Sequence, residues 1–544
     1  MLVVALRDGA ELLALVAILY VALAGLRAAV RKATQRGKTW LQCWADSLLE
    51  LPFRMRLGRF GRPTDVQAAL RGAMHATKLS TLCLPGEPED LSFVERYAKT
   101  RTAGMAVLGG LEYSPLGHVI VQTAMQRRME VRLRFVDYLT RNPQIAQLQL
   151  KDPIFVIGFP RTGTTFLHEL LGLHPKVRMH YTWEQIDPVP GVGGRGGGGG
   201  RGGGGGRGGG GGTEEVSAEE MRRDRLRRYR KNKFFFSVLR SLLGDAVQSI
   251  HRIGYDEVGF LSFCLCLSCL SLHFVLTSPP PPQPEECTTP ISMELPWAVS
   301  ELPLHVAAPQ LLNDGAGQAF RYYRRYLQML SWQNPLGETM DAAAAAASAE
   351  PRFIDGGADK TWMLKCPFHP PYLDALLEEF PRATIVWTHR DPVECVASAC
   401  SLYETLACVA VETTSLDRRK LGAAVLDYTE LALKRALDAL ASPAAKHANV
   451  LHIRYADNVK DPVKICNQVL TKAGIIGGGG QEGDLHQQEW STRVQAYIAK
   501  NKAERLARGN KQQAGKLHDY CLADYGLSEA AVRDRFKTYC DKYA

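Results

Sequence analysis

The sequence predicts an α/β fold, in which a P-loop-containing parallel sheet is flanked by helices and preceded by a helical N-terminal lead-in. From residue 152 onward, short apolar runs are each closed by a polar turn and followed by a helix-like segment. These runs are IFVI, WMLK, TIVWT and VLHIRY. Strands that alternate with helices favour a parallel sheet covered on both faces. The 544 residues, 46 % of them hydrophobic, suffice for one large domain or two ordinary ones.

Residues 1–38 combine an uncharged apolar run with a basic flank. The run Leu12–Leu26 is shorter than the roughly 20 residues that cross a bilayer, but snorkelling of Arg27 could extend it. We expect a single membrane anchor here, with an amphipathic or buried helix as the alternative. Basic residues follow the run, so the positive-inside rule would keep the main domain in the cytosol.

Residues 39–150 are expected to form the helical lead-in. The run HVIVQTAMQRRMEVRLRFVDYL alternates charged and apolar residues at helical spacing. The main domain, residues 151–544, follows and carries two interruptions. Residues 191–212 form a glycine tract with interspersed arginines, and residues 260–283 form an apolar run that ends in consecutive prolines. The second run is too long for a strand and has no polar face as a helix; we expect it to lie outside the working fold, with a second membrane span as the rival.

The net charge and the cysteine content limit the kinds of ligand and metal site that the sequence is compatible with. The net charge of +10 suits anionic ligands without singling out nucleic acid. The thirteen cysteines are scattered, and the close cluster Cys264, Cys266 and Cys269 has no matching second pair. Neither a disulfide framework nor a zinc spacing is visible, so we expect no metal site.

The stretch DPIFVIGFPRTGTTFLHELL has the spacing of a phosphate-binding loop. Gly158 allows a sharp turn where the chain leaves the strand, and Gly163 allows the backbone to approach a ligand closely. Thr164 opens a helix whose free amides, with the hydroxyls of Thr164 and Thr165, form a cradle for an oxyanion. The lysine that a Walker loop places on the β and γ phosphates is absent. Arg161 stands earlier in the loop, where it could neutralise a single phosphate.

A second anion-binding element lies in TIVWTHRDPVECVASACSLYE. A strand runs into Arg390, after which Asp391 is placed as an N-cap, Pro392 lies in the first helical turn, and Glu394 completes a capping-box pattern. Arg390 and Ser398 are eight residues apart. A guanidinium fork and a hydroxyl together suit one dianionic group.

These two elements resemble those of the sulfotransferases that use 3′-phosphoadenosine 5′-phosphosulfate (PAPS). FPRTGTT is similar to the family's 5′-phosphosulfate loop, and the resemblance assigns the 3′-phosphate to Arg390 and Ser398. Tyr455, in RYAD, corresponds to the family's tyrosine near the adenine. The loop residues implied in donor binding are Arg161, Thr162, Gly163, Thr164 and Thr165.

Other stretches resemble the subfamily of larger, divergent sulfotransferases. They are HPKVRMHYTWEQIDPVP, WMLKCPFHPPYLDALLEEFP, IRYAD and, as a weaker match, GKLHDYCLADYGLSEAAVRDRFKTY. The resemblance extends over roughly residues 90–544, apart from the two interruptions. It implies one PAPS-dependent sulfotransferase domain that needs no magnesium.

The implied reaction is in-line transfer of a sulfuryl group from PAPS to an acceptor hydroxyl. Arg161 and the loop amides would stabilise charge on the departing phosphate, and Lys365 at a strand end could touch the sulfuryl oxygens. Three residues are candidates for the general base. Glu184 occupies the place of the glutamate base in tyrosylprotein-type enzymes, His251 resembles the histidine of the subfamily, and His369 is the third candidate.

Two other function classes compete with this interpretation. A P-loop kinase or NTPase would need the missing lysine and an acidic magnesium ligand at a strand end. An RNA-binding protein is suggested by the Arg-Gly tract, but the tract has no aromatic residue to stack on bases, so we expect no nucleic-acid partner. The acceptor could be a carbohydrate, a protein tyrosine or a small metabolite. A membrane-anchored family member suggests the Golgi, whereas the flanking charges suggest a cytoplasmic domain.

Overall fold

The computed structural model describes residues 9–34, 40–55, 65–88, 92–180, 182–191, 218–243, 316–333, 339–341, 352–354, 360–477, 488, 490–503 and 521–543. Three features singled out above fall outside these ranges: His251, the apolar run 260–283, and the glycine tract 191–212 apart from its first residue.

A five-stranded parallel sheet in the order β2-β5-β1-β6-β7 forms the centre of the fold. Its strands are β1 (Ile154–Ile157), β2 (Val177–Arg178), β5 (Thr361–Lys365), β6 (Thr384–His389) and β7 (Asn449–Arg454). The parallel sheet and four of these strands confirm the prediction. The two-residue β2 was not predicted, because so short a strand has no periodicity. An antiparallel pair, β3 (Thr339–Asp341) and β4 (Arg352–Ile354), lies apart from this sheet.

Helices cover both faces of the sheet, as the sequence predicts. Alternate residues of β1 enter different apolar clusters: Ile154 and Val156 join one, and Phe155 and Ile157 join the other. Because side chains of a strand alternate between faces, these clusters mark the two sides of the sheet. All four β1 residues are buried, which explains why IFVI is apolar throughout rather than alternating.

One face is covered by α6 (Thr164–Gly172), α18 (Pro462–Lys472) and the helical residues 490–503. The larger cluster on the other face includes residues of α5, α12, α14, α15 and α16. The bounds of the long helices on this side are α5 (Pro115–Arg141), α12 (Ala316–Trp332), α14 (Leu373–Glu379), α15 (Pro392–Ala407) and α16 (Arg418–Ala441). Short helical turns lie next to them in the chain: η3 (Pro143–Gln147), η6 (Pro370–Tyr372), η7 (Thr413–Ser415) and η8 (Pro443–Ala445).

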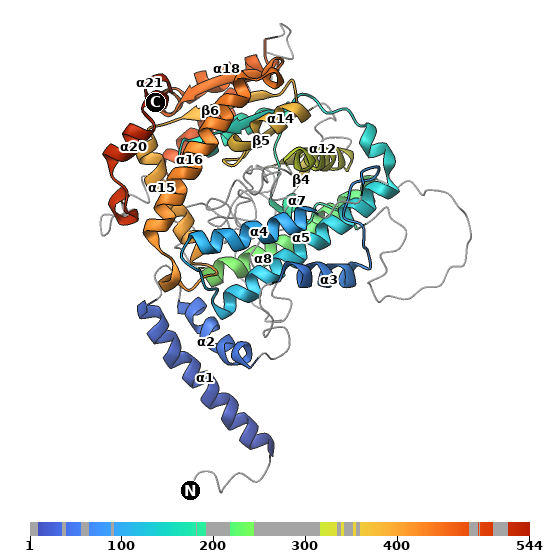
Figure 1. The fold of residues 1–544 in the computed structure, drawn as a ribbon. Coiled ribbons are helices and arrows are strands. Elements are labelled where there is room, and N and C mark those ends of the chain that lie inside the picture. The colour runs from blue at the N-terminus through green and yellow to red at the C-terminus, as the bar shows by residue number, and fades with distance from the viewer. Residues whose placement is uncertain are drawn as a thin grey trace, which may run out of the picture.

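The lead-in is helical, as expected. It comprises α1 (Gly9–Thr34), α2 (Trp40–Arg54), α3 (Val66–Thr77), α4 (Ser92–Val107) and α5. Figure 1 shows α3, α4 and α5 beneath the sheet, with α8 (Ala218–Leu243) among them. The remaining helices are α7 (Thr182–Ile186), α17 (Tyr455–Lys460), η9 (Leu522–Tyr525), α20 (Glu529–Arg535) and α21 (Lys537–Tyr543).

The apolar run expected to anchor the chain lies within α1, which extends away from the rest of the molecule beside α2 (Figure 1). The base of α1 is held by ion pairs from Arg31 to Glu50 at 3.4 Å and to Glu412 at 2.6 Å. No helix in the described ranges, α1 included, has the length and apolar character needed to cross a bilayer. The expected transmembrane segment is therefore not found among them.

Candidate functional site

The residues singled out by the sequence gather where parallel strands end. The phosphate-binding loop follows β1, Lys365 ends β5, Arg390 follows β6, and Tyr455 follows β7. After β1 the chain adds β5 on one side and β6 on the other. Ligands of open α/β sheets bind outside the carboxyl ends of the strands at such a switch point. The fold thus assembles one site from four segments distant in sequence.

The two loop glycines have the conformations that the sequence implied. Gly158 has φ 149°, and a Cβ there would lie 2.4 Å from the Thr388 hydroxyl oxygen. Gly163 has φ 84° and is the N-cap of α6. A Cβ at Gly163 would lie 3.0 Å from the ring of Tyr455. Any larger residue at either glycine would therefore collide with the strand or ring beside the loop, in addition to straining the backbone.

Arg161 has an unusual backbone conformation. Its φ of 75° lies in the left-handed region, which is costly for a residue with a side chain and is often found at ligand-binding sites. The residue is exposed. Its carbonyl accepts a hydrogen bond of 2.8 Å from Nη1 of Arg390. The backbone of one predicted anion-binding arginine therefore fixes the side chain of the other.

The loop threonines divide into two groups. Thr162 is fully buried, and its hydroxyl donates to the Phe159 carbonyl at 2.8 Å and lies 2.7 Å from the Thr388 hydroxyl. Its side chain therefore braces the loop from behind. Thr164 begins α6 and is also buried, whereas Thr165 is partly exposed and accepts a bond from Lys365.

Lys365 lies beneath the loop at the end of β5. Its side chain is buried, and Nζ donates to the Thr165 hydroxyl at 3.0 Å. Burial lowers the pKa of this ammonium to about 7, because removal from water disfavours the charged form. A small change in nearby charge can therefore switch Lys365 between protonation states near neutral pH.

Arg390 stacks on Tyr455. The guanidinium carbon lies 4.1 Å from the centre of the Tyr455 ring, and the group also pairs with Glu394. Asp391 caps α15 as predicted, accepting from the Val393 amide at 2.9 Å. The capping-box pattern predicted that Glu394 would bond to the N-cap backbone. Its carboxylate pairs with Arg390 instead. Ser398 lies in the second turn of α15 and is buried.

Glu184, a candidate base, is buried in α7 and ion-paired. One carboxylate oxygen lies 3.1 Å from Nη2 of Arg178, and the Arg178 guanidinium stacks on Trp362 at 4.2 Å. Tyr326 donates to the Glu184 carbonyl at 3.0 Å. The ion pair with Arg178 uses one of the two carboxylate oxygens.

His369, the third candidate base, lies in an aromatic enclosure. It is 1 % exposed, and its ring centre lies 5.4 Å from that of Phe155 and 5.9 Å from that of Phe320. Within the described residues neither ring nitrogen has a hydrogen-bond partner. Burial lowers its pKa to about 3, which makes the imidazole a weak base.

Three residues that sequence reasoning missed belong to this region. Thr388 contacts Thr162, Arg178 pairs with Glu184, and Asn458 reaches the Gly163 carbonyl at 3.5 Å. Thr388 is the last residue of the predicted strand TIVWT. A hydroxyl at the end of a strand beside the loop could have indicated that it belongs to the site. Nothing in the sequence marks the other two as parts of the site.

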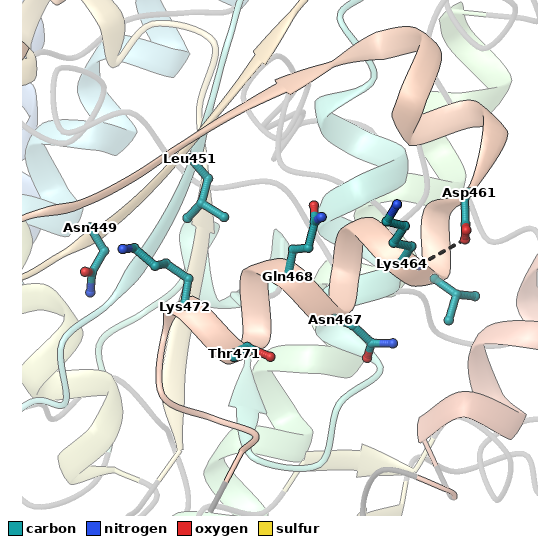
Figure 2. A pocket seen from close by; sticks show the side chains of 9 residues that line it. Asn449, Leu451, Asp461, Lys464, Asn467, Gln468, Thr471 and Lys472 are labelled. Atoms are coloured by element: carbon teal, nitrogen blue, oxygen red, sulfur yellow. Dashed lines mark hydrogen bonds between the residues drawn. The ribbon is translucent and has the colours of Figure 1, made fainter.

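A pocket between β7 and α18 is separate from this site. It has a volume of about 990 Å³ and is lined mainly by polar side chains of the two elements (Figure 2). None of the predicted site residues lines it. Within the described part of the chain, no group of three or more histidine, cysteine or acidic side chains is placed to hold a metal ion.

Comparisons with known proteins give consistent results. The model of a family described as the sulfotransferase family matches residues 153–197 and 272–476. The fold is similar to that of sulfotransferase STF9 from Mycobacterium avium, with a TM-score of 0.56, 19 % identity, and coverage of 89 % of this chain and 98 % of that one. It is also similar to sulfotransferase STF1 from Mycobacterium tuberculosis H37Rv, with a TM-score of 0.55, 20 % identity, and coverage of 88 % and 100 %. No curated protein matches the sequence.

The family match covers most of the site. Its two segments contain the phosphate-binding loop, Glu184, Lys365, Arg390 and Tyr455, whereas His251 falls in the unmatched stretch 198–271. The second segment resumes at residue 272, inside the apolar run that we expected to lie outside the fold. The two crystal structures, at their low identities, establish similarity of fold.

Proposed function

We propose that the chain is a member of the sulfotransferase family and that it transfers a sulfuryl group from PAPS to a hydroxyl-bearing acceptor. The observation that carries this proposal is the contact between the two anion-binding elements. Nη1 of Arg390 donates to the carbonyl of Arg161 at 2.8 Å, so the arginine assigned to the 3′-phosphate is tied directly to the loop assigned to the 5′-phosphate. A nucleotide with anionic groups on both the 3′ and 5′ positions of its ribose suits this arrangement.

The residues present fit such a donor. The Arg161 side chain is exposed at the loop, and Tyr455 stacks on Arg390 while its ring borders Gly163. An aromatic ring in this position could stack on an adenine. When bound, PAPS would supply the sulfuryl group and a phosphate as leaving group.

The chain's own groups would stabilise the charge that develops during transfer. The first amides of α6 point out of the helix N-terminus and have no partner within the helix. Together with Arg161, they would hold the oxygens of the 5′-phosphate as negative charge accumulates there. Lys365, in its protonated form, would extend this positive charge toward the sulfuryl oxygens through its position beside Thr165.

In-line displacement also requires a base for the acceptor proton. We propose Glu184 or His251 for this role. Glu184 could accept the proton on the carboxylate oxygen that does not face Arg178, while the ion pair to Arg178 orients the group. His369 is less suited, because burial lowers its pKa to about 3 and aromatic rings surround it.

The kinase alternative fits the site less well. It needs a P-loop lysine and an acidic magnesium ligand at a strand end, whereas the described ends of β5, β6 and β7 lead into Lys365, Arg390 and Tyr455. The basic tract that suggested RNA binding lies outside the described residues.

The proposal is tested by incubating the protein with sulfur-labelled PAPS and a cell extract. Label should appear as a sulfate ester on the former acceptor hydroxyl, and an equimolar amount of 3′-phosphoadenosine 5′-phosphate (PAP) should form. Transfer of label from γ-labelled ATP, with none from PAPS, would instead support the kinase alternative. The chemical nature of the product would identify the acceptor as carbohydrate, protein or small metabolite.

A further inference from the structure

The C-terminal segment, residues 521–543, packs on the turn that carries Arg390, and we propose that it is a positioning element for this arginine, acting chiefly through Tyr539. This inference rests on the proposed function, in which Arg390 binds the 3′-phosphate of the donor. Figure 1 shows α20 and α21 at the side of the sheet where β6 ends. Three contacts join the segment to the turn.

The first contact is made by the Tyr539 hydroxyl. It lies 2.9 Å from Nδ1 of His389, the last residue of β6. The backbone N–H of Arg390 also lies near this hydroxyl. Tyr539 is 4 % exposed, so the bond to His389 is shielded from water. The phenol oxygen thus fixes the imidazole of His389 directly beside the peptide bond that joins the strand to Arg390.

The second contact is a stack of rings. Tyr543 lies parallel to His389, with ring centres 4.6 Å apart and an angle of 14° between the planes. It also lies 4.9 Å from His452 of β7. Nε2 of His389 is 2.8 Å from Nδ1 of His452. His389 is therefore held by hydrogen bonds at both nitrogens and by a ring on one face.

The third contact is an ion pair. Nη2 of Arg533, in α20, lies 3.0 Å from the carboxylate of Asp391. The same carboxylate caps α15 through the Val393 amide. The three contacts fall on His389 and Asp391, the residues on either side of Arg390, so the segment fixes the turn rather than one side chain.

Arg390 has a particular need for such support. Its guanidinium must meet a dianionic group while touching the loop carbonyl of Arg161 and the ring of Tyr455. An arginine side chain has many rotamers, and the entropy lost on binding falls when its backbone is already fixed. Displacements of about 1 Å in a positioning residue can have large effects on a bound ligand.

A purely structural role for the segment would have different consequences. Most of the packing comes from rings, which remain when a tyrosine is changed to phenylalanine. Tyr539→Phe removes the hydroxyl alone. Tyr525→Phe is a matched control, because Tyr525 belongs to the same segment and its hydroxyl bonds Glu404 at 2.8 Å, in the last turn of α15 and away from the turn that carries Arg390.

The experiment compares the binding of PAP with that of adenosine 5′-monophosphate (AMP), which lacks the 3′-phosphate. The dissociation constant of AMP divided by that of PAP measures how much the 3′-phosphate contributes to affinity. In the wild type this ratio should be about ten or more, since a charge-assisted contact is involved. In Tyr539→Phe the ratio should fall about three- to ten-fold with AMP affinity unchanged, and in Tyr525→Phe it should remain at the wild-type value.

A second variant tests the inference independently, in case Tyr539→Phe does not fold. Arg533→Gln alters an exposed ion pair and should lower the ratio about two-fold in the same direction. A wild-type ratio in both Tyr539→Phe and Arg533→Gln would overturn the inference, as would equal weakening of PAP and AMP. If the wild type itself does not distinguish PAP from AMP, the assignment of Arg390 within the proposed function fails instead.

Discussion

The hydroxyl oxygens of Thr162 and Thr388 lie 2.7 Å apart, joining the phosphate-binding loop to the end of β6. Both side chains are buried, and the Thr388 hydroxyl oxygen also lies 3.3 Å from the Ile157 carbonyl at the end of β1. A Cβ at Gly158 would enter the space between the two hydroxyls. The loop and the strand that leads to Arg390 are therefore fastened to each other directly, before any ligand binds.

Thr388→Val should loosen this junction. The change keeps the shape of the side chain but leaves the Thr162 hydroxyl with one partner fewer, at a cost of about 1–3 kcal/mol in the free energy of unfolding. PAP affinity should fall several-fold as the loop and the Arg390 turn become independent. Urea unfolding and PAP titration measure the two effects.

Thr429→Val is the control for that variant, since Thr429 is buried in α16 and its hydroxyl bonds only the local Val425 carbonyl among the bonds described, at 2.7 Å. It should alter stability without altering PAP affinity. Equal PAP affinity in wild type and Thr388→Val would show that the junction does not support the nucleotide site.

Arg390→Ala should weaken PAP binding about ten-fold or more, because it removes a charge-assisted contact worth roughly 1.5–3 kcal/mol. Arg382→Ala is the matched control. Arg382 lies just before β6, at the opposite end of the strand, and pairs with Asp152 at 3.1 Å on the surface. Titration calorimetry of both variants is the measurement; wild-type affinity in Arg390→Ala would disprove the 3′-phosphate assignment.

Glu184→Gln and His251→Ala separate chemistry from recognition. Each should leave PAP binding nearly intact, and the residue that is the base should lose turnover by about 10²–10⁴. Because Gln cannot pair with Arg178 as a charge, the unfolding of Glu184→Gln must be measured beside its activity. If both variants keep full turnover, His369 becomes the next candidate despite its enclosure.

Lys365 should make PAPS binding dependent on pH. Its pKa of about 7 leaves the group partly neutral at pH 7.5, and anionic sulfuryl oxygens nearby would favour the charged form. Binding at pH 7.5 should therefore take up protons, and more for PAPS than for PAP. Calorimetry in buffers of different ionisation enthalpy measures this uptake, which Lys365→Met should abolish.

The same pKa predicts how Lys365 affects stability. The folded-state pKa lies below the value of about 10.4 for an unfolded lysine, so the unfolded state binds more protons between these limits. Stability contributed by the neutral amine is thus present at high pH and lost as pH falls toward 7. As the pH falls from 10 to 7, the wild type should lose this stability and Lys365→Met should not. In urea unfolding, the variant should therefore become more stable relative to the wild type as the pH falls. If the stability difference between the variant and the wild type does not change with pH, the pKa of Lys365 is not lowered in the folded state.

Four strands of the sheet and the phosphate-binding loop could be predicted from the sequence, because local patterns encode them. IFVI and TIVWT are continuous apolar runs, as both-face burial requires, and Gly163 supplies the left-handed N-cap of α6. Asp391 and Pro392 mark the start of α15 in the same local way. These features lie within a few residues of the chain, where spacing alone predicts them.

Which of these elements contact one another depends on the packing of the whole chain. Thr162 and Thr388 are 226 residues apart, and His389 and Tyr539 are 150 apart. They meet because β6 pairs beside β1 and because α21 packs against the end of β6. The ion pair between Glu184 and Arg178 also depends on tertiary packing. The local sequence places a carboxylate on a short helix, but the packing of the surrounding elements brings a cation to face it.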